Sequence, residues 1–435
     1  MSKDYIKGLK KFISTSETAY QTVDTIKSVL DDNGFIKLDE NKKFNIHEDG
    51  KYYVVRNSSS IIAFTVGGLS KYNFKIAASH SDSPCFKIKE NAEIKVRDKY
   101  MQLNTEGYGG MLLAPWFDRP LSIAGRVFVK TKKSEDTSFS VGGVSASEKH
   151  LSIDRDLLII PNLAIHMNRK VNEGYTYNKQ VDMLPLFGGE DLKEGCFKAL
   201  IAKELGVKES DIISSDLFLY NRTKPTVIGA NEEFIAAPRI DDLECAYTTL
   251  EAFVNAKKSS GISVYACFDN EEVGSTTLQG AGSTFLADIL KRINLALNKS
   301  EEDYYLAVAD SFMLSCDNAH AVHPNHPEKS DQTNAVYINN GVVIKQNANQ
   351  KYTSDALSIA RFKMICEKAD VPYQFFANRS DEPGGSTLGN IAMSQVAAHA
   401  VDIGLAQLAM HSPYETAGVK DVEYMVKAVK TFYEE

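Results

Sequence analysis

The sequence predicts an α/β protein whose core is interrupted by a β-rich insert. In the first and last parts of the chain, short apolar runs alternate with longer helix-like stretches, a rhythm that is typical of a sheet covered by helices. Between about residues 90 and 230 the pattern changes to alternating apolar and polar residues punctuated by glycines, which is typical of exposed strands and turns. We therefore predict core segments at 1–90 and 229–435 and an insert at 91–228.

The first core segment opens with a predicted amphipathic helix over residues 16–30, whose apolar side chains recur at helical spacing. This helix ends before Asn33-Gly34, a typical carboxyl-terminal signal. A strand is predicted over residues 72–79, YNFKIAAS, and it runs directly into His80. Its apolar character is typical of a strand that is buried on both faces of a sheet.

The insert and the second core segment contain further predicted strands and a closing helix. In the insert, EIKVRD and RVFVKT alternate apolar with polar residues, as half-exposed strands do. In the second core segment, ISVYACF, YYLAVA and FMLSC are short apolar runs separated by longer helical patterns, so we predict that they are strands. Residues 419–433 place apolar side chains on one face and charges on the other, which predicts a helix packed on the sheet.

The composition is close to that of ordinary globular proteins, with 43% hydrophobic and 24% charged residues in 435. Acidic residues outnumber basic ones by 57 to 49, and the net charge of −8 argues against binding to nucleic acid. No run reaches the ~18 apolar residues of a membrane span, and the amino terminus lacks the apolar core of a signal peptide. The six cysteines form no CxxC pair, which favours reduced thiols. We therefore expect a cytoplasmic protein that binds neither nucleic acid nor membrane.

Several apolar runs end in side chains that can bind a metal ion. His80 and Asp82 end the predicted strand at 72–79, and the adjacent pair Glu271 and Glu272 directly follows ISVYACF. In open α/β sheets ligands collect beyond the carboxyl ends of the strands, so these residues are expected to share one site. An isolated His-x-Asp is more often a structural histidine, and an acidic pair is more often solvated surface. The position of both at strand ends favours the metal site.

The remaining candidates are ambiguous from the residues alone. The two aspartates of PRIDDLECAY precede a helix-like run, where helix capping is an equal alternative, and the prolines of HAVHPNHP prevent its equally spaced histidines from sharing a helix face. These candidates are Asp241, Asp242, His320, His323, His326 and His411. Together, histidines and several carboxylates suit zinc or manganese and favour a paired-metal hydrolytic centre. HExxH, GxSxG, Walker and Rossmann motifs are absent from the sequence, which argues against the corresponding enzyme classes.

Seven motifs, in this order along the chain, resemble those of the aspartyl aminopeptidase family of dinuclear zinc exopeptidases. The motifs are AASHSDSPCFKIK, YGG followed by WFDRPLSIAGRV, IPNLAIHMNR, PRIDDLECAY, DNEEVGS, SCDNAHAVHPN and QLAMHS. The resemblance covers essentially the whole chain. It implies a zinc-exopeptidase-like α/β/α sandwich core, an inserted β-rich dimerisation domain that also acts as a lid, and the removal of amino-terminal residues from peptides.

The resemblance also implies a complete set of metal ligands for two Zn²⁺ ions per subunit, with Mn²⁺ or Co²⁺ as possible substitutes. A bridging aspartate would contact both ions, and two further ligands would bind each ion: these are Asp241 as the bridge, His80 and Asp317 on one ion, and Glu272 and His411 on the other. Glu271 would be the general base and Asp82 would orient His80. Asp317 is preferred to Asp310 because it lies within the matching motif, and Asp242 occupies a neighbouring position that the family does not use as a ligand.

Substrate and assembly are further implications of the resemblance. Lys345 matches a lysine implicated in the preference for amino-terminal Asp or Glu, although neutral residues are also possible, and Tyr352 matches a nearby pocket residue. His320 is expected near the substrate rather than on zinc. His166 is expected to reach toward the active site of a partner subunit, in homodimers that assemble into a dodecamer.

Two alternatives are weighed against the aminopeptidase. One is a related dinuclear amidohydrolase, such as a deacylase or a carboxypeptidase, built on the same core. The other is a catalytically silent scaffold that keeps the fold and the assembly surface. Cleavage of amino-terminally blocked peptides separates the first alternative from an aminopeptidase, which needs a free amino terminus. The complete set of predicted ligands and base argues against the second.

Overall fold

The computed structural model describes residues 2–132 and 137–435 and divides into two compact units. The core unit comprises Met1–Ser83, Pro225–Met410 and Glu415–Glu435, and the insert unit comprises Pro84–Lys224 with His411–Tyr414. The predicted insert, 91–228, therefore starts too late and ends too late. The alternation of apolar and polar residues first becomes clear at EIKVRD, but this run lies within a strand that already begins at Cys85. The boundary of the insert unit therefore precedes the change in residue pattern.

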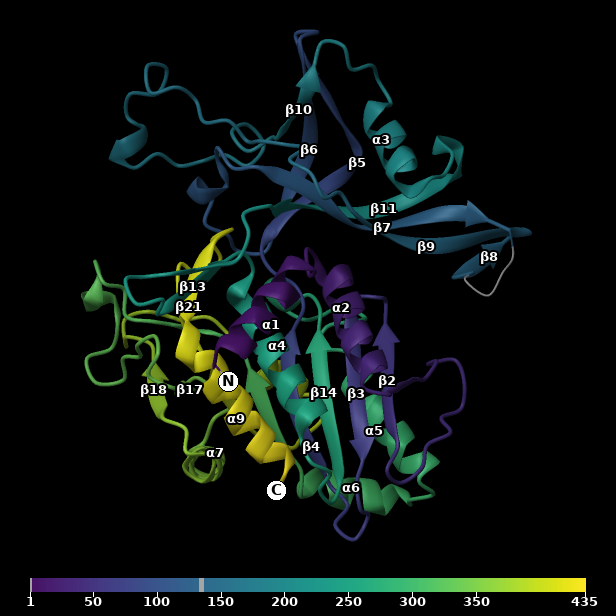
Figure 1. The fold of residues 1–435 in the computed structure, drawn as a ribbon, viewed down its shortest axis with the longest axis vertical. Coiled ribbons are helices and arrows are strands. Elements are labelled where there is room, and N and C mark those ends of the chain that lie inside the picture. Colours follow the sequence, from purple (N-terminus) through teal and green to yellow (C-terminus); the bar gives the residue numbers. More distant parts are fainter. Residues whose placement is uncertain (1, 133–136) are drawn as a thin grey trace. The chain divides into compact units, whose positions relative to one another are not determined.

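The core unit is built on a nine-stranded mixed sheet with the order β1-β2-β3-β14-β4-β15-β19-β17-β18 (Figure 1). Its strands are β1 (Ile36–Lys37), β2 (Lys51–Arg56), β3 (Ser60–Val66), β4 (Phe74–His80), β14 (Ile262–Phe268), β15 (Phe312–Cys316), β17 (Val342–Gln346), β18 (Tyr373–Ala377) and β19 (His399–Gly404). Four neighbouring strands, β14, β4, β15 and β19, run parallel to one another. Their carboxyl ends therefore lie at one edge of the sheet.

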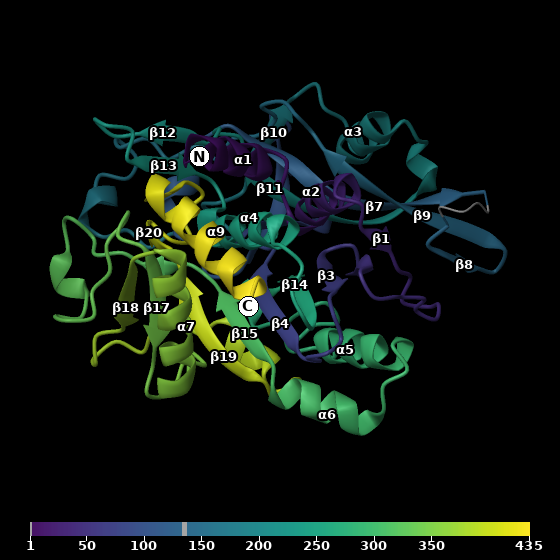
Figure 2. The ribbon, with the colours of Figure 1, turned by 60° about the horizontal axis from the view of Figure 1, so that its bottom comes forward.

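Helices cover both faces of this sheet, as Figures 1 and 2 show. The core helices are α1 (Ser2–Ser14), α2 (Ala19–Asp32), α4 (Ile240–Asn255), α5 (Phe285–Ala296), α6 (Glu301–Ala309), α7 (Ala356–Ala369), α8 (Leu388–Ala392) and α9 (Val419–Tyr433), with short 3-10 helices at Glu271–Val273 and Pro327–Lys329. Alternate strand residues point to opposite faces. Ala77 belongs to the hydrophobic cluster that includes residues of α1, α2, α4, α7 and α9, whereas its neighbours Ile76 and Ala78 belong to the cluster that includes residues of α5, α6 and α8.

A smaller five-stranded sheet in the core unit has the order β12-β13-β21-β20-β16. Its strands are β12 (Thr226–Ile228), β13 (Phe234–Ala237), β16 (Ala319–His320), β20 (Ala406–Leu408) and β21 (Glu415–Gly418). β13 leads directly into α4, and β16 and β20 closely follow the ends of β15 and β19. This sheet therefore arranges the segments that leave the carboxyl edge of the large sheet.

The insert unit has its own seven-stranded antiparallel sheet, in the order β10-β6-β5-β11-β7-β9-β8. Its elements are β5 (Cys85–Val96), β6 (Tyr100–Tyr108), β7 (Leu121–Thr131), β8 (Phe139–Val141), β9 (Val144–Ser152), β10 (Leu186–Gly189), β11 (Ile212–Asn221), α3 (Cys196–Leu205) and 3-10 helices at Ala114–Trp116, Val171–Glu173 and Glu209–Asp211. Its apolar core includes Phe86, Trp116 and Leu217. A separate core explains why the sequence texture changes within this part of the chain.

These two kinds of sheet confirm the predicted fold class, an α/β core with a β-rich insert. One predicted element is wrong, and one helix was not predicted. The run YYLAVA is not a strand but lies in α6, where a reciprocal capping box between Ser300 and Asp303 begins the helix. The predicted opening helix, observed as α2, is preceded by α1, whose Ile6, Leu9 and Ile13 are buried at helical spacing.

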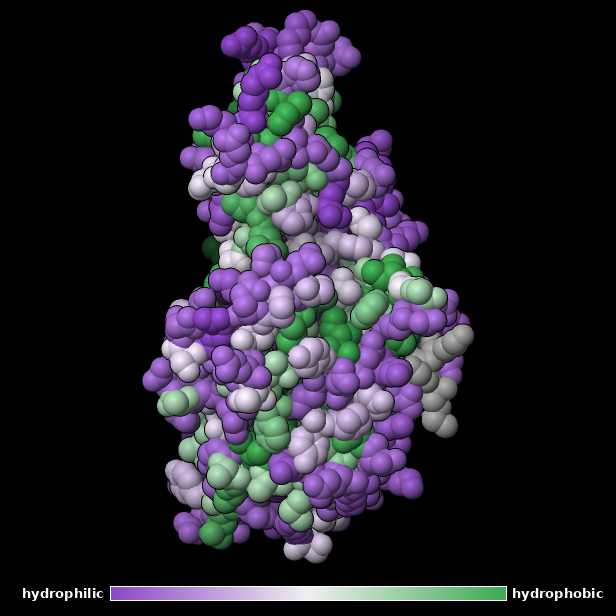
Figure 3. All heavy atoms as spheres, turned by 90° about the vertical axis from the view of Figure 1, so that its left-hand side faces the viewer, coloured by the Kyte–Doolittle hydropathy of each residue, from purple (hydrophilic) through white to green (hydrophobic). Residues whose placement is uncertain are grey.

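The surface is largely polar on the face that Figure 3 shows, where hydrophobic side chains occur as small separate groups. Exposed apolar residues of this scattered kind are normal for globular proteins. Within residues 2–132 and 137–435, no helix combines the length and the apolar character that crossing a membrane requires.

Candidate metal centre

The carboxyl edge of the large sheet brings together the metal-capable side chains of the core unit. His80 is the last residue of β4, and Asp317 directly follows β15. Glu271 and Glu272 form the short 3-10 helix that follows β14, and Asp241 lies in the first turn of α4. All of these residues belong to the core unit, in which neighbouring parallel strands hold them at the same level of the sheet.

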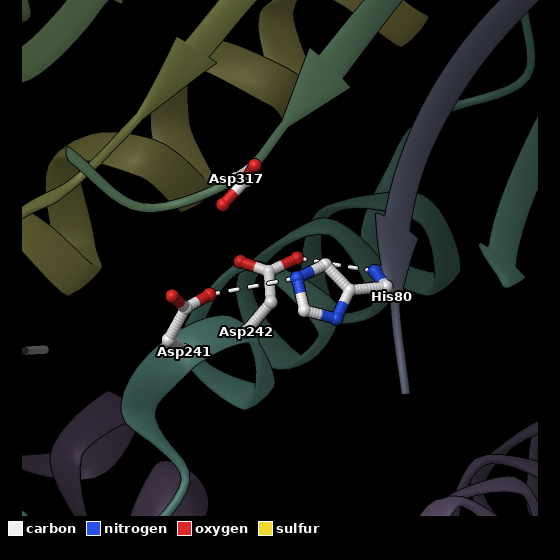
Figure 4. A group of neighbouring side chains, drawn as sticks. All are labelled: His80, Asp241, Asp242 and Asp317. Carbon is white, nitrogen blue, oxygen red and sulfur yellow. Dashed lines mark hydrogen bonds and ion pairs between the residues drawn. The ribbon is translucent and has the colours of Figure 1, made fainter. Parts of the chain in front are cut away.

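His80 is fully buried among carboxylates (Figure 4). Its Nε2 lies 3.5 Å from Oδ1 of Asp241. Its backbone N–H donates to Oδ2 of Asp242 at 3.1 Å. Asp317 points into the same space from the end of its strand. One ring nitrogen of His80 thus faces the group of carboxylates from which metal ligands would come.

Asp82 holds two parts of the centre at once. Its Oδ1 and its carbonyl oxygen lie 3.3 and 3.1 Å from Nδ1 of His80, on the side of the ring away from Asp241. The same carboxylate accepts the backbone N–H groups of Glu271 and Glu272 at 3.1 and 3.2 Å. A contact of this kind fixes the tautomer and orientation of a metal-binding imidazole. Asp82 therefore couples the orientation of His80 to the position of the glutamate pair.

Burial makes several carboxyl groups of the centre hard to ionise. Burial is the main cause that raises the pKa of Glu271 to about 8, and the nearby carboxylate of Asp317 adds to the effect. Burial also raises the pKa of Glu272 and of Asp242 well above the usual range. For His80, burial alone would lower the pKa, but the surrounding carboxylates raise it well above its ordinary value.

This donor set fits divalent metal ions. Two groups each supply ligand atoms that lie within 4.8 Å of one another: His80, Asp241, Asp242 and Asp317, and His80, Glu271 and Glu272. Imidazole with several carboxylates is a combination that zinc and manganese accept. Buried carboxylates at this spacing repel one another, and a divalent cation would offset that repulsion and take the place of the proton on His80.

A second layer of buried polar side chains lies behind these residues. The backbone N–H of Asp241 donates to Oε2 of Glu415 at 3.1 Å, and Oε1 of Glu415 accepts from Nε2 of Gln407 at 3.3 Å. Nδ2 of Asn318 donates to Gln407 at 2.8 Å and to Glu244 at 3.1 Å. The layer thus connects the first turn of α4 with the end of β15, and such outer contacts orient metal ligands.

Lys345 supplies a buried positive charge on the other side of Asp317. Its side chain is 3% exposed, and its Nζ lies 3.6 Å from Oδ2 of Asp317. Nζ also donates to the carbonyl oxygen of Asn318 at 2.8 Å and lies 5.4 Å from the ring centroid of Tyr352. Burial lowers the pKa of Lys345, but Asp317 and other anionic partners raise it above the ordinary value on balance. The side chain therefore stays an ammonium at neutral pH.

A cavity of about 570 Å³ lies beside this edge of the core unit. Its wall includes β16, the end of β18 with the segment 378–385 that follows it, and residues 407–410. Charged and imidazole side chains of the wall are His320, His323, Lys329, Asp331, Arg379 and Glu382. The volume of the cavity is within the usual range for small-ligand sites, and its wall carries both acidic and basic side chains.

Comparison with known proteins identifies the family of this chain. A family model described as "Aminopeptidase I zinc metalloprotease (M18)" matches residues 12–433. The chain belongs to the M18 aminopeptidase family. It is therefore a zinc metalloaminopeptidase, a hydrolase that acts on peptides, and the predicted family and enzyme class are confirmed.

Similar M18 proteins span almost the whole chain. "Probable M18 family aminopeptidase 2" of Clostridium acetobutylicum is 48% identical over 435 residues, covering 99% of this chain and 98% of its own. "Aspartyl aminopeptidase 4" of Saccharomyces cerevisiae is 37% identical over 473 residues, covering 99% and 94%. The solved mApe1 dodecamer of S. cerevisiae is 26% identical, with a TM-score of 0.84 over 99% of this chain and 96% of that one.

The other predicted site residues of this M18 aminopeptidase lie in different places. Tyr352 is buried, whereas His320 is exposed on β16 and lines the cavity. His166 is exposed in the insert unit. His411 also belongs to the insert unit, where its Nδ1 lies 2.5 Å from the carbonyl oxygen of Gly110. The roles of these four residues stay predictions.

Two buried carboxylates of the M18 core, Glu415 and Asp402, are not among the residues predicted in the sequence analysis, and a third, Asp242, is named there but not chosen. Asp242 is set aside there as a ligand, yet it accepts the backbone N–H of His80 and belongs to the same group of possible ligands. Glu415 gives no sequence signal, because its contact with the backbone of Asp241 spans 174 residues. Asp402 does give one, because a charged residue inside the apolar strand β19 indicates a satisfied buried acceptor.

Gly404 offers a direct test of how closely the M18 centre is packed. An added Cβ would lie 1.8 Å from the carbonyl oxygen of Asp317, so Gly404→Ala must displace the start of the segment that carries this carboxylate. We expect zinc affinity to fall at least about tenfold, with a loss of roughly 1–3 kcal/mol in the free energy of unfolding.

Zinc titration against a competing chelator measures the first effect, and thermal unfolding measures the second. Gly189→Ala is the matched control, because nothing lies within 4 Å of the Cβ it adds. Equal zinc affinity in the two variants would show that Asp317 does not depend on this packing.

Proposed function

We propose that this M18 enzyme uses two zinc ions to remove acidic, and more slowly neutral, amino-terminal residues from peptides. The observation that carries the proposal is the burial of His80 among carboxylates from the first turn of α4 and from the ends of neighbouring strands, with Glu271 beside them. We assign Asp241 as the bridging ligand. The proposed ligands of the individual ions are His80 and Asp317 for one, and Glu272 and His411 for the other.

In this proposal Glu271 is the general base. When bound, zinc ions acidify the attacking water and polarise the scissile carbonyl. The carboxylate of Glu271 takes the proton of that water and returns it to the leaving amine. Without metal, burial raises the pKa of Glu271 to about 8. Bound zinc ions would lower this pKa, so that Glu271 is a carboxylate able to accept the proton near neutral pH. Asp82 keeps the backbone of Glu271 in place through its contact with that residue's N–H.

The proposed preference for a free amino terminus follows from charge. The candidate ligands and base are predominantly carboxylates, and an ammonium group of the substrate is attracted to such a site, whereas an N-acetyl group is not. We expect peptides with a free amino terminus to be cleaved at least about a hundredfold faster than their N-acetylated forms. Chromatographic assay of matched peptide pairs with zinc-loaded enzyme tests this expectation, and equal rates would favour a deacylase or another amidohydrolase.

The proposed preference for acidic residues rests on Lys345. We expect Lys345→Met to lower the ratio of kcat/KM for Asp- over Ala-initiated peptides by about tenfold or more, because a charge-assisted contact with the substrate carboxylate is lost. The ratio is the decisive readout. Since Lys345 also lies 3.6 Å from Asp317, a purely structural role would lower both rates by the same factor and leave the ratio unchanged.

Assembly and compartment complete the proposal. We propose a cytoplasmic homododecamer built from dimers, in which the insert unit forms dimer contacts and covers the site as a lid. The solved mApe1 dodecamer supports this assembly. His166 is exposed in the insert unit, and we propose that it reaches the substrate of a partner subunit. Light scattering of the wild-type protein tests the oligomer. A monomer that is fully active would contradict the proposal for His166.

A further inference from the structure

Asp402 is a buried carboxylate that belongs neither to the candidate ligands nor to the proposed base. It lies on β19, between apolar neighbours, and its side chain has no solvent exposure. Its Oδ1 accepts hydroxyl donors from Ser315 at 2.5 Å and from Thr387 at 2.7 Å. Its Oδ2 accepts the backbone N–H of Thr353, and its own N–H donates to Oγ of Ser354 at 3.0 Å. Three donors thus satisfy both oxygens of this buried carboxylate.

These contacts join three segments that are distant in sequence. Ser315 lies on β15, which pairs with β19, and it precedes Asp317 by two residues (Figure 2). Thr353 ends the loop 347–353, between β17 and α7. Thr387 ends the loop 378–387, between β18 and α8. Asp402 therefore fixes the far ends of two loops to the strand that leads into the centre.

Both loops shape the cavity described above. Residues 378–385 form much of its wall, and Phe376, which also lines it, precedes this loop. The other loop contributes Tyr352, whose ring packs edge-on against Phe376 with 6.3 Å between centroids. One loop therefore lines the cavity and the other supports its wall from behind.

Local packing shows that the contact with Asp402 is specific. Thr387 occupies the amino-terminal capping position of α8, yet its hydroxyl makes no capping bond and donates to Asp402 instead. An added Cβ at Gly389 would lie 2.6 Å from Oγ of Ser315 and 3.0 Å from Oδ1 of Asp402. The start of α8 therefore packs closely against the carboxylate of Asp402, and the space between them accommodates a hydroxyl group but not a larger side chain.

We propose that Asp402 is a positioning residue that holds loops 347–353 and 378–387 in the conformation that binds the peptide substrate. It touches neither the substrate nor the candidate metal ligands, and it acts through the two loop ends. The proposal rests on the proposed aminopeptidase function for its kinetic consequence, but the positions of the loops can be measured without any turnover.

The kinetic test removes one anchor at a time. Thr387→Val keeps the shape of the side chain and removes only the hydroxyl that Asp402 accepts. We expect KM for a peptide with a free amino terminus to rise about tenfold, the usual size for a lost hydrogen bond to a charged group, while kcat changes less than about threefold. Thr387→Ser, which keeps the hydroxyl, is expected to restore KM. Ser394→Ala removes an exposed hydroxyl outside both loops and is the matched control.

Asp402→Asn tests the carboxylate itself. The amide can still accept the N–H of Thr353, but its NH₂ group must face the hydroxyls, so we expect an intermediate rise in KM with zinc content unchanged. If this variant does not fold, Thr387→Val still decides the question. An unchanged KM in Thr387→Val, or a fall in kcat with no change in KM, would overturn the proposal.

Hydrogen exchange of the zinc-loaded, substrate-free enzyme separates this proposal from the proposed function. In Thr387→Val we expect the amides of both loops, including that of Thr353, to exchange about tenfold faster, with the rest of the core unit unchanged. Unchanged exchange in the loops, or faster exchange throughout the core, would overturn the positioning role. If the wild-type enzyme cleaved blocked and free peptides equally, the proposed function would fail. The hydrogen-exchange rates of the two loops would still test the positioning role of Asp402.

Discussion

Glu271→Gln is expected to lower kcat by about 10²–10⁴-fold while leaving both the fold and the zinc content unchanged. The amide has nearly the same shape as the carboxylate but cannot accept the proton of the attacking water, and this range is typical of a lost general base. The candidate ligands His80, Asp241 and Glu272 are untouched by the substitution. Steady-state kinetics and metal analysis of the same preparation measure the two properties.

The control for this prediction is Glu367→Gln, which makes the same chemical change at an exposed position of α7. It is expected to match the wild type. If Glu271→Gln retained more than about a tenth of the wild-type kcat, another group would have to accept the proton. If it lost zinc together with activity, Glu271 would be a ligand rather than the base.

Metal-free enzyme is expected to lose stability as pH rises from about 5 to about 8. Burial raises the pKa of Glu271 from 4.5 to about 8, and it raises those of Glu272 and Asp242 in the same direction. Folding therefore favours the protonated forms, and their contribution to the free energy of unfolding is fully present below pH 4.5. That contribution is lost as pH rises through the folded-state pKa values, because ionised carboxylates repel one another in the buried site.

Bound zinc is expected to reverse this trend, since the cation stabilises the ionised carboxylates. The difference in Tm between zinc-loaded and chelator-treated protein should widen by at least about 5 °C between pH 5 and pH 8. Thermal unfolding at both pH values measures it. The metal-free Glu271→Gln variant, which lacks one titrating group, should show a smaller pH dependence. Parallel Tm curves with and without zinc would mean that these groups are not at the metal site.

The sequence allowed three central strands of the large sheet, β14, β4 and β15, to be predicted, and also the meeting of several candidate residues at their carboxyl ends. His80, Asp317 and the glutamate pair each follow an apolar strand, and the carboxyl ends of parallel strands meet at one edge. A metal-capable side chain at the end of an apolar run, which is a local pattern, therefore predicts which distant residues meet in the fold. The position of Asp241 and Asp242 in the sequence does not show which of the two would be a metal ligand. The resemblance to a family favours Asp241.

The features that the sequence did not reveal depend on contacts between distant residues or on local capping. Glu415 meets the backbone of Asp241, and Asp402 meets two loop ends, only because several elements pack in one register. The run YYLAVA has an apolar pattern compatible with a strand, and a capping box at Ser300 decides for the helix. The pattern of apolar and polar residues changes gradually near the start of the insert, so this pattern predicts a boundary several residues later than the one between the two compact units.

The arrangement of β4 has a consequence for how the protein forms during synthesis. Both neighbours of β4, β14 and β15, come from the chain after the insert, so this strand leaves the ribosome long before it can pair with either. Its largely apolar segment Phe74–His80 therefore stays exposed to solvent, or bound to a chaperone, until those strands are made. Nascent chains that stop before residue 312 would lack the β15 side of the sheet. Such fragments should aggregate rather than cut peptides, so peptide-cleaving activity arises only once most of the protein has been made.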